Sequence, residues 1–145
     1  MNHLRRRGAV RVVAALAAVV LLMLVGSRPV GAEDAKGPSY RCTDPSQVYL
    51  GNPRLFKKPA VLSADRVYRA IPEYQEILAK NLTDRDVRYH FLMRKASDKF
   101  TSAVGTVARD AGYDLVAHQG AVLAETADTP APPDVTDTVI SKLPA

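Results

Sequence analysis

"VARDAGYDLVAHQGAVLAE", residues Val107–Glu125, changes its pattern at Gly112. Before this glycine the stretch has the mixed charged and apolar pattern of a helix. After it, two short apolar runs, Tyr113–His118 and Ala121–Glu125, flank Gln119-Gly120. A glycine directly after a helix takes the left-handed conformation that ends it, and a glycine-containing pair between two apolar runs is typical of a hairpin turn. The stretch therefore predicts a helix that ends at Gly112 and a β-hairpin that follows it.

The helix before this glycine is expected to span residues 85–111. Its large apolar residues recur every seven positions, with small apolar residues between them at spacings of three and four, which is the pattern of a heptad seam. The large members of the seam are Met93, Phe100 and Val107. Phe91 and Leu92 lie outside the seam, near the beginning of the helix. They are therefore the candidate residues for contact with a bound polypeptide.

A shorter helix is expected to precede the long one. Pro72 suits the first turn of a helix, where the missing N–H group costs nothing. Asn81 is suited to end that helix in a left-handed conformation, and Thr83 or Asp84 to cap the next one. Together these signals predict an antiparallel helical hairpin over residues 72–111.

The remaining segments predict a small β body, so the expected fold class is α+β. Pro59–Ser63 is a short apolar run with a proline at its start, where a strand tolerates one. Thr136 is the predicted N-cap of a short C-terminal helix. One strand and one hairpin cannot bury both of their faces within one chain, so an oligomer is expected. The candidate assembly residues are Val61, Leu115, Val116, Val122 and Leu123.

The first 32 residues have the three-part pattern of a secretory signal peptide. Arg5, Arg6 and Arg7 precede an unbroken apolar run of 14 residues, Val12–Val25, and small residues follow it up to Ala32. A helix that spans a bilayer needs about 20 residues, so we expect export with cleavage between Ala32 and Glu33. An uncleaved membrane anchor is the alternative.

Residues 33–58 contain three prolines and two glycines without clear periodicity, which predicts a flexible arm. Cys42, in this segment, is the only cysteine of the chain. An intramolecular disulfide is therefore excluded, and the thiol is expected to be incidental.

The positive charge of the chain is concentrated in two places. The whole chain carries a formal charge of +5, but residues 1–32 hold five arginines and no acid, so residues 33–145 are neutral. The argument for nucleic-acid binding thereby loses its main support. Residues 54–109 hold 12 basic and six acidic side chains. This excess favours an acidic polypeptide or an anionic membrane surface as the partner.

Residues that could carry out catalysis are scattered along the chain. His90 and His118 have no second histidine or carboxylate at a spacing typical of metal ligands. No serine lies in a strand–turn–helix elbow, and no glycine-rich loop is present that could bind phosphate. We therefore expect no enzymatic activity, no metal and no cofactor.

Three segments in order are similar to the Skp/OmpH family of periplasmic chaperones for outer-membrane proteins. "AVLSADRVYRAIPEY" (60–74) resembles the opening strand, short helix and proline of that family, and the stretch 107–125 resembles the return of its helical arm. "PDVTDTVISKL" (133–143) is similar to its closing helix. The resemblance implies a Skp/OmpH-like domain over 59–145, a periplasmic homotrimer, and binding of unfolded outer-membrane proteins between helical arms.

The sequence departs from this family in the length of the arm. Only residues 73–110 separate the proline from the returning glycine, so three such arms would enclose a shallow cavity. The first hypothesis is a trimeric holdase, which binds unfolded outer-membrane proteins and keeps them from aggregating. The alternative is a trimeric structural or adaptor module of the cell envelope without holdase activity, anchored by an uncleaved signal.

Overall fold

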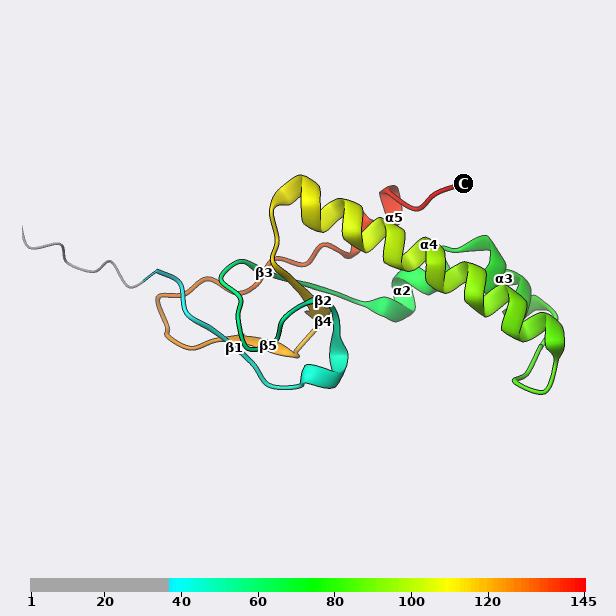
Figure 1. The fold of residues 1–145 in the computed structure, drawn as a ribbon, viewed down its shortest axis with the longest axis horizontal. Helices are drawn as coiled ribbons and strands as arrows, with labels where there is room; N and C mark the ends of the chain where they lie inside the picture. Colours follow the sequence, from blue (N-terminus) through cyan, green and yellow to red (C-terminus); the bar gives the residue numbers. More distant parts are fainter. Residues whose placement is uncertain (1–36) are drawn as a thin grey trace, which may run out of the picture. The chain divides into compact units, whose positions relative to one another are not determined.

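The computed structural model describes residues 37–145, and within this range the chain folds as α+β (Figure 1). The strands are β1 (Tyr40–Cys42), β2 (Val48–Gly51), β3 (Pro59–Leu62), β4 (Leu115–His118) and β5 (Val122–Ala124). The helices are the 3-10 helix η1 (Pro45–Gln47) and α2 (Ala64–Arg69), α3 (Pro72–Ala79), α4 (Val87–Ala111) and α5 (Thr136–Ser141). The predicted signal segment and its cleavage site at Ala32 and Glu33 lie outside the described residues.

The strands form two small sheets, and β4 is the central strand of the larger one. The three-stranded sheet has the order β2-β4-β3, in which β4 is antiparallel to β2 and parallel to β3. The two-stranded sheet joins β1 and β5 in antiparallel pairing. At the corner between the sheets, the Thr43 amide donates to the carbonyl of Ala121 over 2.9 Å. The segment 40–51 therefore runs antiparallel along the whole of the segment 115–124.

The predicted β-hairpin is wrong in its pairing, although its turn is present. The Ala121 amide donates to the His118 carbonyl over 3.0 Å, and Gly120 has φ 85°. However, β4 and β5 belong to different sheets and do not pair with each other. The reason is that the segment 40–51 supplies each of them with an antiparallel partner, so the chain bends at the turn instead of closing a hairpin.

The prediction of a flexible arm is wrong for residues 40–51, which form β1, η1 and β2. The residues that suggested disorder have local roles there. Pro45 begins η1, where its missing N–H group is not needed. Gly51 has φ 96°, and a Cβ atom at this position would lie 2.1 Å from the carbonyl oxygen of Asp114. A glycine is therefore required where β2 passes β4.

The long helix is confirmed, and it ends as predicted. Gly112 has φ 70° and ψ 33°, and the Tyr113 amide donates to the Ala108 carbonyl over 2.8 Å. The prediction was wrong at the start, because Asp86 rather than Thr83 or Asp84 is the N-cap residue. The Asp86 carboxylate instead accepts a hydrogen bond from the Thr83 amide, 2.8 Å away.

The C-terminal half of α4 packs on the sheet instead of projecting from it. Its buried residues belong to the main core cluster, together with residues of β3, β4, α2 and α5. They are Ala96, Phe100, Ala103, Val104, Val107 and Ala108. The three alanines let the helix backbone approach its neighbours closely, which a seam of large residues alone would not allow. Figure 1 shows α4 passing from the strands, beside α5 and α2, to its N-terminal part beside α3.

The shorter helix α3 begins and ends as predicted. Pro72 is its first residue, and Asn81, two residues after its end, has φ 50°. α3 packs against α4. The buried side chains of this contact are Ile77 and Leu92, which are 4% and 5% exposed and belong to neither core cluster. This end of the molecule thus has its own small apolar seam.

Candidate binding surface

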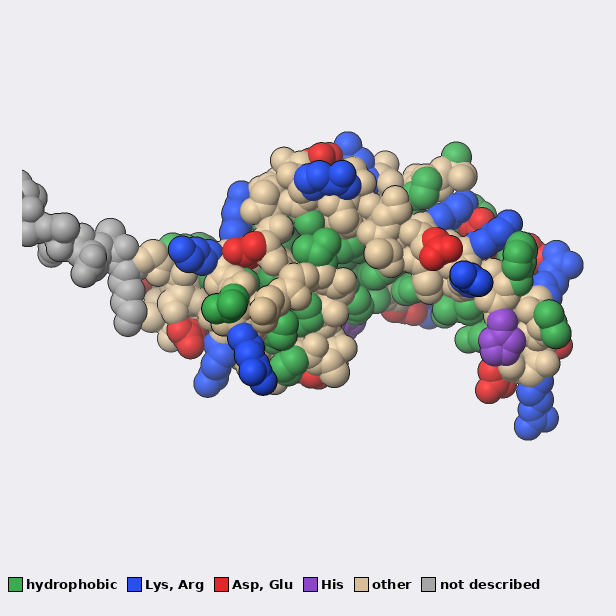
Figure 2. Space-filling model, in the orientation of Figure 1, with side chains coloured by type: hydrophobic (Ala, Val, Ile, Leu, Met, Phe, Trp, Pro, Cys, Tyr) green, Lys and Arg blue, Asp and Glu red, His purple; other side chains and the backbone are tan. Residues whose placement is uncertain are grey.

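Three large apolar side chains are exposed at the end of the molecule formed by α3, the loop 80–86 and the start of α4. Leu78, Val87 and Phe91 are 49%, 86% and 58% exposed, and we call them the tip surface. Val87 and Phe91 are four residues apart and therefore share one face of α4. Figure 2 shows hydrophobic side chains among Lys and Arg side chains over this end. Exposed apolar side chains of this kind are the feature that a polypeptide-binding surface requires.

The two predicted contact residues on α4 have opposite environments. Phe91 is exposed, in agreement with the prediction, whereas Leu92 is 5% exposed and faces the seam with α3. The prediction was wrong for Leu92 because the buried stripe of α4 follows residues 92, 96, 100, 103 and 107. Met93, which the heptad pattern placed in the seam, is only half-buried. Leu92 is therefore a structural residue of the α3–α4 contact.

Basic side chains surround the tip surface, and the nearby glutamates are already paired. The Lys95 ammonium lies 4.6 Å from the centre of the Phe91 ring, a distance typical of a cation–π contact. Glu76 pairs with Lys80 at 2.8 Å and with Arg88. Hydrogen bonds from Lys80 and Arg88 lower the pKa of Glu76. Arg94, exposed one residue before Lys95, makes no ion pair with any of the described residues.

A largely buried ion pair ties α3 to the middle of α4. The Glu73 carboxylate lies 3.1 Å from the Lys99 ammonium, and the two side chains are 17% and 19% exposed. Burial opposes ionisation of Glu73, but the backbone amide at the start of α3 and Lys99 outweigh it, so the pKa of Glu73 is lowered. The second carboxylate oxygen of Glu73 is buried without a hydrogen-bond partner. The charge of Lys99 is thus important for keeping Glu73 ionised.

The predicted assembly residues are mostly core residues of a single chain. Val61, Leu115, Val116 and Val122 are at most 8% exposed, whereas Leu123 is 48% exposed. The argument for an oligomer was wrong on this point, because residues 40–51 cover the strands that were expected to need another chain. Of the five, Leu123 is the residue whose side chain is open to a contact with another molecule.

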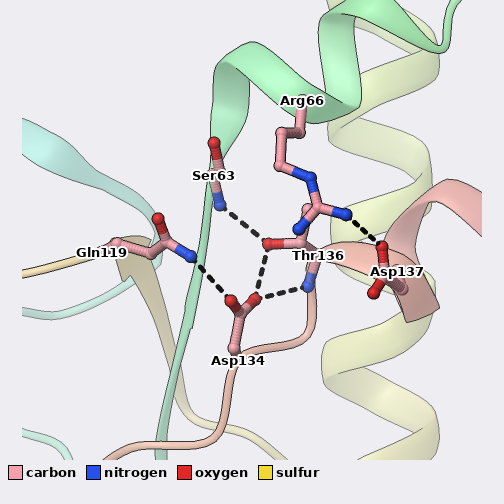
Figure 3. Close-up of polar contacts among 6 residues, drawn as sticks. All are labelled: Ser63, Arg66, Gln119, Asp134, Thr136 and Asp137. Carbon is pink, nitrogen blue, oxygen red and sulfur yellow. Dashed lines mark hydrogen bonds and ion pairs between the residues drawn. The ribbon is translucent and has the colours of Figure 1, made fainter.

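The Asp134–Asp137 motif closes the fold (Figure 3). The Asp134 carboxylate accepts hydrogen bonds from the Thr136 amide at 2.9 Å and hydroxyl at 2.5 Å, and from the Gln119 amide group at 2.6 Å. These bonds, those from Thr136 first, lower the pKa of Asp134. The Thr136 hydroxyl also accepts from the Ser63 amide over 2.9 Å. The motif therefore joins the end of β3, the turn after β4 and α5.

The prediction that Thr136 is the N-cap of the last helix was wrong by one residue. The N-cap is Val135, and Thr136 is the first helical residue, 1% exposed. Thr136 is buried because its hydroxyl binds both Asp134 and the backbone of Ser63, as described above. Arg66 of α2 pairs with the Asp137 carboxylate at 2.7 Å and adds a contact at the surface. The network has a structural role, since all its inner members are satisfied by one another.

The two histidines of the described residues lie in different parts of the structure. Nδ1 of His118 is 3.2 Å from the hydroxyl of Tyr49, and Nε2 of His90 is 2.6 Å from the carbonyl oxygen of Asp84. No cluster of three metal-ligating side chains occurs within residues 37–145. Over the same range, none of the helices combines the length and apolar character that crossing a bilayer demands.

Sequence reasoning missed Leu78 and Val87 as parts of the exposed surface. Leu78 was placed in the apolar stripe of the first helix, and Val87 falls off the heptad pattern. The signal that could have found Val87 is its position directly after Asp86, at the start of α4, where the partner helix no longer covers it. No protein-family model, curated protein or solved structure matches the chain.

Proposed function

We propose that this protein is an exported, chaperone-like protein of the periplasm that binds unfolded outer-membrane proteins through its tip surface. The observation that carries the proposal is the exposure of Leu78, Val87 and Phe91 at the α3–α4 end, next to basic side chains. Unfolded outer-membrane proteins offer alternating apolar segments in water. Leu78, Val87 and Phe91 would shield such segments, and Lys95 and Arg94 would attract acidic groups beside them.

The order of the elements supports the resemblance on which the proposal also rests. A strand, a short helix and a helix begun by Pro72 are followed by a long helix that ends at Gly112, a strand and a closing helix. These are the elements that the Skp/OmpH resemblance implies, in the same order. The closing motif, through Asp134 and Thr136, has a defined place in the fold.

The packing of α4 defines the kind of binding that we propose. Residues 96–108 of α4 lie in the core, so the part of the helix beyond the body is short. The protein would therefore contact segments of an unfolded chain rather than enclose a whole barrel. In the proposed homotrimer, three tip surfaces would bind one unfolded chain at several points, and the linked contacts would raise the overall affinity.

An aggregation assay tests the proposal directly. An outer-membrane barrel protein is diluted from urea with and without this protein, and light scattering is recorded. We expect the wild type to suppress aggregation and the double substitution Val87→Ser and Phe91→Ser to lose most of that effect. Leu55→Ser is the matched control, because Leu55 is 77% exposed and lies outside the tip. A wild type that does not suppress aggregation contradicts the holdase, and an equal loss in the control contradicts the role of the tip.

A trimeric structural or adaptor module of the envelope is the second candidate function. The observation in its favour is the small extent of the tip surface, which contains three exposed large apolar side chains. This candidate predicts a trimer by size-exclusion chromatography with light scattering, but no suppression of aggregation. A monomer in that measurement contradicts the trimeric form of both candidates.

A further inference from the structure

A second exposed surface combines apolar and basic side chains at the opposite type of element, the loop 52–58 between β2 and β3. Leu55 in this loop is 77% exposed, although the loop itself is held firmly. The Asp114 carboxylate accepts hydrogen bonds from the backbone amides of Lys57 and Lys58, at 2.7 and 2.8 Å. The Lys58 ammonium donates to the Ala111 carbonyl over 2.6 Å. The exposure of Leu55 is thus a feature of a fixed loop.

The two-stranded sheet adds to this surface. Arg41 of β1 and Leu123 of β5 are directly opposite each other, and both are exposed. Tyr40 of β1 and Phe56 of the loop pack against the same core cluster, which brings the loop and the sheet together. We call Arg41, Arg54, Leu55, Lys57 and Leu123 the body patch. Figure 2 shows Lys and Arg side chains beside hydrophobic ones over this part of the molecule.

The cations of the body patch are not neutralised by the nearby acids. Arg41, Arg54 and Lys57 make no ion pair with any residue in the range 37–145. The acids close to them along the paired strands are engaged otherwise. Asp114 binds the two loop amides, Asp44 accepts from the Ser46 amide and hydroxyl, and Glu125 accepts from the Ser39 hydroxyl. The patch therefore presents free positive charge around two leucines.

We propose that the body patch docks on an anionic lipid surface, with Leu55 inserted among the headgroups. Arginine and lysine side chains pair with lipid phosphates, and an apolar side chain between them gains from leaving water. The position of the patch in the chain supports this partner. Its first residue lies in β1, and only 15 residues separate the apolar run Val12–Val25 from Tyr40. That length spans at most about 50 Å, so a membrane-bound leader would bring the patch to the bilayer.

This proposal is independent of the proposed function, since the body patch and the tip surface share no residue. Unfolded proteins would bind at α3 and α4, whereas the lipid surface would be contacted by the loop 52–58 and the sheet of β1 and β5. Docking through the body patch would leave the tip surface free for an unfolded chain. The two proposals can therefore fail separately.

The absence of tryptophan from the chain allows a position-specific test on the full-length protein. Leu55→Trp places a single reporter in the body patch, and Val87→Trp is the matched reporter in the tip surface, at another exposed apolar residue. Emission spectra are recorded with vesicles of phosphatidylglycerol and of phosphatidylcholine. Lipids brominated in the acyl chain are then used as quenchers, which report insertion of the reporter itself regardless of what residues 1–36 bind.

We expect the emission of Leu55→Trp to shift to shorter wavelength and to be quenched with phosphatidylglycerol vesicles only. Adding Arg54→Gln and Lys57→Gln should weaken vesicle binding by about 25-fold, since each cation near an anionic surface contributes about fivefold. Salt should weaken it as well. The proposal is overturned if Leu55→Trp does not respond, if it responds equally to phosphatidylcholine, or if Val87→Trp alone responds.

Discussion

The tip surface and the body patch both present large apolar side chains beside cations, but the structure supports them differently. The body patch lies on a loop and a sheet that pack against a core cluster through Phe56 and Tyr40. The tip surface rests on a seam of Ile77 and Leu92 and on ion pairs such as that between Glu73 and Lys99. A similar surface composition is therefore held by apolar packing at one place and largely by charge at the other.

The largest expected effect comes from the core on which both regions depend. Phe100 is 5% exposed, stacks on Tyr68 with ring centres 4.9 Å apart, and meets Tyr49 edge to face. Phe100→Ala should lower the free energy of unfolding by about 4 kcal/mol, measured by urea denaturation. Phe91→Ala, on the same helix but exposed, should change it by no more than about 0.5 kcal/mol. Similar losses in the two variants would contradict the assignment of α4's buried face.

A substitution at Gly51 tests the ordered pairing of β2 with β4. Gly51→Ala places a Cβ atom against the Asp114 carbonyl, at a φ of 96°. The clash and the backbone strain together should cost about 3 kcal/mol, measured by thermal unfolding. Gly105→Ala is the control, because a Cβ atom there meets no other atom within 4 Å and alanine favours the helix. An unchanged melting temperature for Gly51→Ala would show that residues 40–51 do not pair as described.

Acid should loosen the tip before it loosens the body. The folded state lowers the pKa of Glu73 below its ordinary value of 4.5, mainly through the α3 amide and Lys99 acting against burial. Its stabilising effect is therefore present above pH 4.5 and is lost as the pH falls through the lowered folded value. Amide hydrogen exchange should show α3 losing protection in this range while β4 keeps it.

The substitution Glu73→Gln separates this effect from the general effects of acid. It should remove the pH dependence of α3 protection and cost about 1 kcal/mol at neutral pH, since both partners keep some contact with water. Glu76→Gln, at a more exposed pair, is the comparison variant and should have a smaller effect. Equal loss of protection in β4 would contradict a tip held by its own contacts.

The smallest expected effect on stability is at the body patch. Leu55→Ser and Leu123→Ser replace side chains that are 77% and 48% exposed, so the free energy of unfolding should change by no more than about 0.5 kcal/mol. Size-exclusion chromatography of Leu123→Ser addresses assembly as well. If Leu123 lies between copies of this chain, the oligomer should weaken while each chain keeps its fold. A large loss of stability in either variant would show that the residue belongs to the core.

The helices were predictable because their signals are local. Pro72, Asn81 and Gly112 act through the conformations of their own backbones, and the structure shows each in the expected role. The turn at Gln119-Gly120 was found for the same reason. The N-caps at Asp86 and Val135 were missed by one to three residues, because several neighbouring polar side chains could serve and only the surrounding contacts select one.

The strand partners were not predictable in the same way. β1 and β2 contain three and four residues, lie among prolines and glycines, and pair with segments more than 60 residues away. Their stability comes from the apolar cluster that they complete, which no short window of sequence contains. The same contact reversed the interpretation of Leu115, Val116 and Val122, which changed from assembly residues to core residues.

The sequence by itself determined where the helices begin and end and which face of α4 is apolar, because capping and periodicity act within a few residues. Only the tertiary structure decided that β4 and β5 take their partners from residues 40–51, and that Leu92 is buried while Phe91 is exposed. These outcomes depend on which surfaces meet, and burial of apolar area rewards contacts between distant segments without regard to their order in the chain.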